Sequence, residues 1–291
     1  MRTQPETLKR SEFTYGVTKD ALALIAPDNA ATLFDAFSMA EKLRQLDLCL
    51  IGARRSFIDV TEILRQFIPY TLVFKVLYKG ESNEIADIKF AVYLRNKKNG
   101  EQKLATNYSL GVGGHVESCD TAYYGDAAQQ PTTEIDVRRM LGDTCLREFQ
   151  EEVSLDANGD EALINIEPVG FVMDSKPEVG YVGNTHVGLI YGLRVPSYSE
   201  FQMAEEINDA IGWFNMDELR EFGKDHSFEP WSRMIIDQVG DILGDRLIGA
   251  EINRVVVAEE VYDSLVNDLE KPKEPNPALV ALLSRPRAER L

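Results

Sequence analysis

The decisive stretch of this chain is Arg147-Glu148-Phe149-Gln150-Glu151-Glu152-Val153-Ser154-Leu155, which lies downstream of Gly113-Gly114-His115-Val116-Glu117. Helical side chains three and four positions apart share a face, so Glu148, Glu151 and Glu152 are neighbours. Two like charges about 4 Å apart repel by roughly 4 kcal/mol at an effective dielectric of about 20. A folded chain tolerates such a cluster by solvating the face, by raising a pKa or by binding a cation.

Carboxylate oxygens of this kind suit Mg²⁺, which takes a few carboxylates together with waters and substrate phosphates. A solvated helix face is the competing interpretation of the three glutamates. The glycine pair upstream weighs against that interpretation, because the two segments together carry a family resemblance.

Together the two segments resemble the Nudix box, in which a glycine and a glutamate precede the pattern Arg-Glu-hydrophobic-x-Glu-Glu-x-Gly-hydrophobic. Gly114 matches the first glycine, and residues 147–155 follow the second half. Three positions depart from the pattern: Asp120 replaces the first glutamate, and Cys119 and Ser154 replace glycines. About 19 extra residues precede Arg147, and we expect a surface loop there because loop-closure entropy grows slowly with length.

The resemblance extends over roughly residues 50–243 to a bacterial branch of MutT-like phosphoesterases, through segments at 66–70, 93–95, 109–115 and 185–189. It implies an α/β (α+β) Nudix fold, with a mixed β-sheet sandwiched between helices. It also implies a hydrolase of phosphorus-containing acid anhydrides that uses Mg²⁺ or Mn²⁺ to cleave a nucleoside diphosphate linked to another group.

The resemblance assigns site residues as well. Glu151 and Glu152 are implied as metal ligands, with Glu148 as a further ligand or as the group that orients water. Arg147 would pair with a helix carboxylate and contribute to the catalytic site. The remaining metal candidates are the carbonyl groups of Gly113 and Gly114 and the carboxylate of Asp120.

Some candidate residues stay open between two roles. A distal acid usually precedes a tryptophan in this family, so Glu205 and Glu206 are candidates, with Glu206 preferred; solvated loop acids are the alternative. Two histidines either contact a phosphate or support the structure: His115 and His186. Four cations either meet substrate phosphates or lie solvated on the surface: Lys75, Arg95, Lys97 and Lys98.

Composition bounds the function class. The chain has 291 residues, 44% of them hydrophobic, and a formal net charge of −17. This charge argues against nucleic-acid or anionic-membrane partners. The sequence has no apolar stretch of about 18 residues, so we expect no transmembrane helix. The three cysteines, Cys49, Cys119 and Cys145, show no CxxC spacing, so we expect a reduced cytoplasmic setting.

Local patterns predict the elements. Apolar runs indicate strands at 71–78, 90–95, 164–173 and 186–195, and a strand at 108–116 that enters the glycine turn. Helical spacing predicts helices at 29–46 with Asp28 as cap, from Thr132 or Thr133 to Ser154, and at 231–243. Residues 213–219 are predicted to form a short strand that continues into a helix. Alternation of strands and helices predicts a layered sandwich.

The chain divides into an N-terminal elaboration (1–66), a Nudix domain (67–244) and a tail (245–291). The tail either packs on the domain or forms a homodimer. Residues 254–285 also resemble the toxin-binding segment of ribbon-helix-helix antitoxins, through features such as Tyr262, Leu265 and the prolines at 272, 275 and 277. The resemblance implies a GNAT-type protein partner for residues 250–291. DNA binding is not implied, because the basic DNA-binding module is not recognisable in the sequence.

Two other functions remain open beside hydrolysis: a non-catalytic Nudix scaffold that binds a nucleotide or a protein, and an antitoxin-like neutraliser of a GNAT acetyltransferase. The departures at Cys119, Asp120 and Ser154 favour a scaffold. The intact Arg147 and its three following glutamates favour hydrolysis, because a scaffold has no physical need for all four.

Overall fold

The computed structural model describes residues 13–54, 63–80, 82–95, 106–116, 137–155, 167–176, 181–203 and 208–252. Residues 1–251 form one compact unit, and residues 252–291 form a second. The predictions for the tail, including the GNAT-type partner, fall outside the described residues and stay predictions. The division at residues 66 and 244 also stays a prediction.

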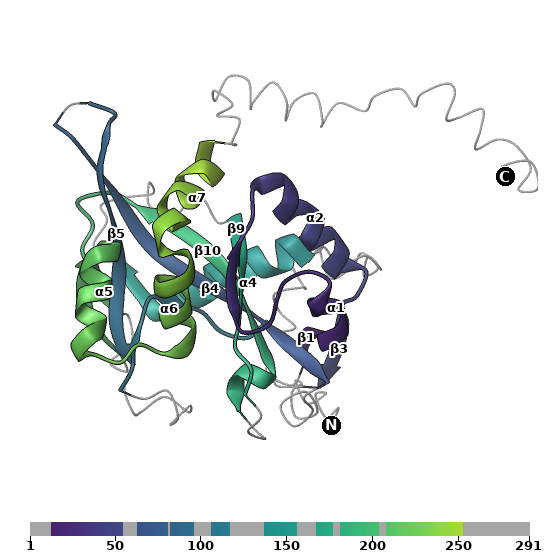
Figure 1. Cartoon of the computed structure of the whole chain (residues 1–291). Coiled ribbons are helices and arrows are strands. Elements are labelled where there is room, and N and C mark those ends of the chain that lie inside the picture. The colour runs from purple at the N-terminus through teal and green to yellow at the C-terminus, as the bar shows by residue number, and fades with distance from the viewer. Residues whose placement is uncertain are drawn as a thin grey trace, which may run out of the picture. The chain divides into compact units, whose positions relative to one another are not determined.

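A 10-stranded mixed sheet organises the described residues (Figure 1). Its main path runs through β12 (Asn208–Phe214), β5 (Ile85–Arg95), β4 (Leu64–Tyr78), β10 (His186–Val195), β9 (Glu167–Met173) and β2 (Ala30–Leu33). β10 is parallel to β4, and the other neighbours on this path are antiparallel. Most of β4 is buried, which explains its nearly continuous apolar run.

Short strands extend the large sheet, and two others form a small sheet of their own. β1 (Phe13–Thr18) pairs with β3 (Ile51–Arg54) and with the start of β4. β6 (Tyr108–Ser109) pairs with β5, and β7 (Gly111–Val112) pairs with β4. β8 (Val153–Leu155) and β11 (Phe201–Met203) form a separate two-stranded sheet.

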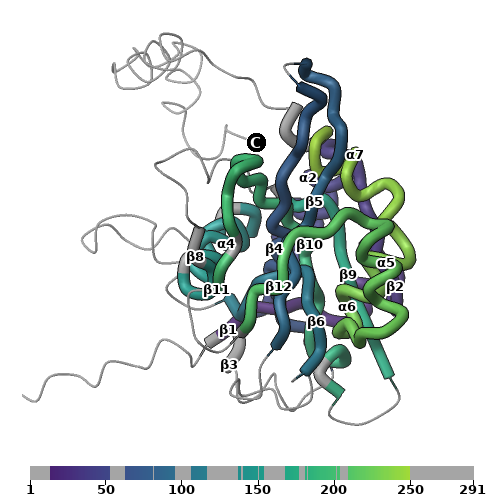
Figure 2. The backbone as a smooth tube through the Cα atoms, turned by 90° about the vertical axis from the view of Figure 1, so that its left-hand side faces the viewer, coloured from purple at the N-terminus to yellow at the C-terminus, as the bar shows by residue number. Residues whose placement is uncertain are grey.

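Helices cover both faces of the large sheet. On one face, α1 (Lys19–Ala23), α2 (Ala36–Asp47) and α4 (Val137–Glu152) contribute to one apolar core. On the other face lie α5 (Met216–Asp225), α6 (Pro230–Met234), the π-helical η4 (Ile235–Val239) and α7 (Gly240–Ile252). Figure 2 shows α4 and the α5–α7 group on opposite sides of the strands. The predicted class, a mixed sheet between helices, is confirmed.

The helix predicted at 29–46 is wrong in its first third. Ala30–Leu33 form β2, which pairs with β9, and α2 begins only at Ala36. Asp35, not Asp28, caps this helix by accepting a hydrogen bond of 2.8 Å from the backbone N–H of Ser38. Pairing with the edge of the sheet outweighed the helical spacing. Among the described helices, none is long and apolar enough to cross a membrane.

Candidate functional site

The glycine turn lies between β4 and α4. β7 pairs with β4 at Thr71 and Leu72 and continues into Gly113 and Gly114. A Cβ atom on Gly113 would lie less than 3.0 Å from the carbonyl oxygen of Pro69. A Cβ atom on Gly114 would lie less than 3.0 Å from the carboxylate of Glu148. The backbone therefore approaches both the strand and the helix more closely than any residue with a side chain allows.

The three glutamates of α4 differ in exposure. The Glu148 side chain is 13% exposed and lies against Gly114, whereas the Glu151 side chain is 57% exposed. Glu152 is partly buried. Glu148 and Glu152 are one helical turn apart, so both carboxylates lie on the side of α4 that approaches the sheet.

Arg147 connects this helix to the glycine turn. Its Nη1 donates to Glu148 Oε1 at 2.7 Å and to Glu151 Oε2 at 3.3 Å. Its Nη2 donates to the backbone carbonyl of His115 at 3.0 Å. One guanidinium thus reduces the repulsion within the glutamate cluster and holds α4 against the turn.

The donor chemistry of this cluster fits a hard divalent cation, because carboxylates and backbone carbonyls supply only oxygen. The close packing of Gly114 on Glu148 places both kinds of donor side by side. Across the described residues, however, no group of three or more His, Cys, Asp or Glu side chains is arranged to hold a metal ion.

Tyr93 on β5 supports the strand that precedes the turn. Its hydroxyl donates to the carbonyl oxygen of Gly111 at 2.8 Å, and Ser109 Oγ donates to the same oxygen at 3.1 Å. Burial raises the pKa of Tyr93 to about 12, and the negative charge of Glu152 adds to the shift. The phenol therefore stays protonated near neutral pH and remains a donor.

A buried carboxylate, Glu229, anchors the same strand from the other face of the sheet. It is 4% exposed and caps α6 by accepting from the backbone N–H groups of Trp231 at 3.0 Å and Ser232 at 2.8 Å. The hydroxyl groups of Ser232 and Tyr70 also donate to Glu229. Ser232 Oγ in turn accepts from Leu110 N at 2.9 Å, so the network reaches the residue ahead of β7.

Replacing Tyr70 by Phe is expected to lower the free energy of unfolding by about 1–3 kcal/mol, because it removes one donor from a buried carboxylate. Burial, followed by the charge of Glu229, raises the pKa of Tyr70 well above its ordinary value, so this donor is permanently protonated. Urea denaturation measures the change.

The matched control for this variant is Tyr78→Phe. The Tyr78 hydroxyl accepts from Arg194 Nη2 at 2.8 Å at an exposed position, so we expect a change within about 0.5 kcal/mol. Equal losses in both variants would contradict a special role for the buried network.

The fold brings His115 and His186 together. Their Nε2 atoms lie 2.9 Å apart, and Nδ1 of His186 lies 3.0 Å from Thr185 Oγ1. His115 follows the glycine turn, whereas His186 opens β10. Their sequence separation concealed this contact, and both residues lie beside the glycine turn.

Lys75 packs against an aromatic ring, and Cys145 is buried. Lys75 Nζ lies 4.4 Å from the ring centroid of Trp213, and desolvation lowers the pKa of this lysine. Cys145 belongs to α4, and its Sγ lies 2.8 Å from Oγ1 of Thr71 on β4. Burial raises the pKa of this thiol to about 12, and the charge of Glu148 contributes in the same direction.

Cys145 is therefore expected to resist alkylation in the folded protein, because only about one thiol in 10⁴ is ionised at pH 8 when its pKa is about 12. Cys49 is exposed and is expected to react. N-ethylmaleimide labelling followed by peptide mass spectrometry measures both. Labelling of Cys145 at the rate of Cys49 would contradict the burial, and labelling in denaturant is the positive control.

Several predicted site residues fall outside the described ranges: Asp120, Cys119, Glu205, Glu206, Lys97 and Lys98. Conversely, the sequence analysis did not assign roles to Tyr70, Tyr93 or Glu229. Glu229 precedes Pro230, and an acid before a proline is a recognised start of a helix. That signal locates the cap but not its contact with Tyr70.

Comparisons with known proteins agree with this architecture. No family model matches the chain. Protein YmaB of Bacillus subtilis (strain 168) is 24% identical over 199 residues, which are 68% of this chain and 82% of YmaB. The crystal structure of Tm1382, which has a provisional Nudix hydrolase assignment, superposes with a TM-score of 0.55 at 19% identity and covers 80% of this chain and 100% of Tm1382.

A second solved structure is that of a NUDIX hydrolase from Alicyclobacillus acidocaldarius. The match covers 60% of this chain and 96% of that hydrolase, with 13% identity and a TM-score of 0.34. That likeness is too distant to carry an argument. The Tm1382 superposition spans the whole of that structure, so this chain has the Nudix fold.

Proposed function

We propose that this protein is a Nudix-type pyrophosphohydrolase, which cleaves a nucleoside diphosphate linked to another group with Mg²⁺ or Mn²⁺. The observation that carries the proposal is the placement of Glu148 against Gly114, with Arg147 bonded both to Glu148 and to the turn. The carboxylates and backbone carbonyls of that turn and helix suit a hard cation, and an anionic substrate would bind through this cation.

Glu148 and Glu152, joined by Glu151 and by the carbonyls of Gly113 or Gly114, would hold the cation. The bound cation would polarise a phosphoryl oxygen and lower the pKa of a bound water. Arg147 fixes the rotamer of Glu148 through a hydrogen bond of 2.7 Å. On the other side of the turn, the Tyr93 hydroxyl holds the Gly111 carbonyl and thereby the strand that leads to both glycines. Asp120 and Glu206 are further proposed contributors to this site.

The test is release of phosphate or nucleotide from a panel of nucleoside diphosphate derivatives, with Mg²⁺, with Mn²⁺ and with a chelator. Metal-dependent release from one class of compound supports the proposal and names the substrate. A folded protein that releases nothing from any compound contradicts it.

A non-catalytic scaffold is the second candidate. The observation that favours it is Arg147, whose Nη1 engages an oxygen of both Glu148 and Glu151. An arginine placed in this way supplies charge neutralisation that a cation would otherwise provide. Tight binding of a panel compound without its cleavage would support the scaffold. The GNAT-type partner for residues 250–291 remains a prediction from the sequence.

A further inference from the structure

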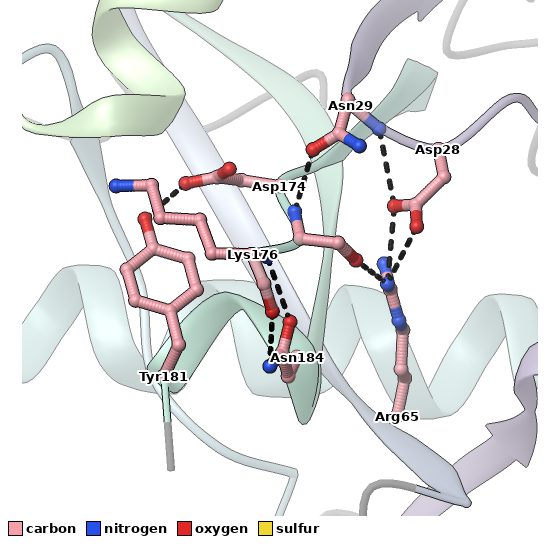
Figure 3. A network of polar contacts seen from close by, with 8 residues as sticks. Asp28, Asn29, Arg65, Asp174, Lys176, Tyr181 and Asn184 are labelled. Carbon is pink, nitrogen blue, oxygen red and sulfur yellow. Dashed lines mark hydrogen bonds and ion pairs between the residues drawn. The ribbon is translucent and has the colours of Figure 1, made fainter. Parts of the chain in front are cut away.

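Arg65 is a buried cation that the proposed reaction does not use. It belongs to the start of β4, and it is 2% exposed and among the largest fully buried side chains. A single nitrogen, Nη2, makes its described contacts (Figure 3). This atom lies 3.0 Å from Asp28 Oδ1 and 3.1 Å from Asp28 Oδ2, and it also donates to Ser175 Oγ.

The rest of the guanidinium lacks acceptors. Nε and Nη1 of Arg65 are buried and have no hydrogen-bond partner within the described part of the chain. More than about 90% of buried polar groups in proteins are hydrogen-bonded, and exceptions often mark an absent water, ion or ligand. A carboxylate that matches the arginine fork bonds two nitrogens at once, whereas Asp28 bonds only one.

Asp28 is the solvent-accessible half of this pair. Its side chain is 48% exposed, so it can turn into solvent, whereas Arg65 cannot leave the core. Partial burial opposes ionisation of Asp28, but the Ser175 hydroxyl and the charge of Arg65 outweigh it and lower the pKa. An ionised carboxylate therefore contacts one corner of a buried guanidinium at neutral pH.

Side-chain amides of two asparagines hold the backbone at Ser175, the residue whose hydroxyl contacts Arg65. Ser175 N donates to Asn29 Oδ1 at 2.7 Å, and Lys176 N donates to Asn184 Oδ1 at 3.0 Å (Figure 3). Asn184 Nδ2 returns a hydrogen bond of 2.8 Å to the Lys176 carbonyl. The Lys176 ammonium lies 4.3 Å from the ring centroid of Tyr181. These hydrogen bonds fix the backbone around Ser175, which carries the hydroxyl that Arg65 contacts.

We propose that Arg65 is the receptor of a small oxyanion site, in which a phosphoryl or carboxylate group of a ligand replaces Asp28 at Nη2 and also bonds a second guanidinium nitrogen that Asp28 leaves without an acceptor. The planar guanidinium recognises two oxygens of such a group, which a neutral ligand atom does not provide. Asp28 stands in for the ligand's oxygens and is displaced when the ligand binds.

The strand register locates this site. Arg65 precedes Gln66, which pairs with His186 across β4 and β10, and His186 contacts His115 beside the glycine turn. The backbone of Arg65 therefore lies at the end of β4 and β10 that also carries the His115–His186 contact. The inference does not require hydrolysis, because a nucleotide-binding scaffold would use the same receptor.

Isothermal titration calorimetry in a chelating buffer tests the proposal, with inorganic phosphate, pyrophosphate and acetate as probes. Wild-type protein is expected to bind at least one probe. Asp28→Asn removes the competing carboxylate and is expected to tighten binding about tenfold, whereas Arg65→Gln weakens it at least about tenfold. Asp217→Asn makes the same charge change on exposed α5 and is expected to leave the affinity unchanged.

Arg65→Lys is the second variant if Arg65→Gln does not fold, since it keeps the buried charge but lacks the planar fork. Weaker binding by Arg65→Lys together with tighter binding by Asp28→Asn supports the site. Preference for phosphate identifies a phosphoryl ligand, and preference for acetate identifies a carboxylate. The proposal is overturned if no probe binds to wild type or Asp28→Asn, or if the Arg65 variants bind as wild type does. The metal-free assay separates this outcome from failure of the proposed hydrolysis.

Discussion

Glu152→Gln is expected to reduce metal-dependent hydrolysis at least about 100-fold in kcat/KM, which corresponds to about 2.7 kcal/mol of transition-state stabilisation. Glutamine keeps the size of the side chain but removes the negative charge that a cation site requires. Glu152 is partly buried, and its negative charge contributes to the raised pKa of Tyr93. Steady-state kinetics with the best substrate of the panel measures the loss.

Stability separates a lost charge from a lost fold in this variant. We expect the free energy of unfolding to change by no more than about 0.5 kcal/mol, because the substitution is nearly isosteric. Glu221→Gln is the control, since it makes the same chemical change on α5, where Glu221 pairs with Lys224 at the surface. Full turnover in Glu152→Gln would remove this residue from the site.

Gly114→Ala is expected to lower kcat/KM by about 10- to 100-fold while costing only about 1 kcal/mol of stability. The new methyl group would displace the carboxylate of Glu148, which is the flexible end of a side chain and can move. The backbone of Gly114 is not in a left-handed conformation, so the contact alone causes the effect. Kinetics and urea denaturation measure the two quantities.

Two other glycines provide the contrast. Gly113→Ala would press against the Pro69 carbonyl oxygen, which cannot move away, so stability should fall by about 3 kcal/mol. Gly142 lies within α4 with open space around its Cα, so Gly142→Ala should raise helix stability by about 0.5–1 kcal/mol and leave turnover unchanged. Full activity in Gly114→Ala would show that Glu148 need not lie beside the turn.

Local sequence patterns predicted much of the fold. The strand at 186–195 agrees with β10, and the helix that carries the glutamates agrees with α4 as far as Glu152. The predicted end at Ser154 is wrong, because Val153–Leu155 pair with β11 as β8. Periodicity succeeds at these places because each element buries a continuous run or a single face. It failed at Ala30–Leu33, where an edge strand of the sheet forms from residues with helical spacing.

The sequence by itself determined the acidic face of α4 and the alternation of strands and helices, because these depend on neighbours within a few residues. Only the tertiary structure decided which distant groups meet. His115 and His186 are 71 positions apart, Asp28 and Arg65 are 37 apart, and Tyr70 and Glu229 are 159 apart. Strand pairing and packing of helices on the sheet bring these groups together, and no local pattern of residues encodes such contacts.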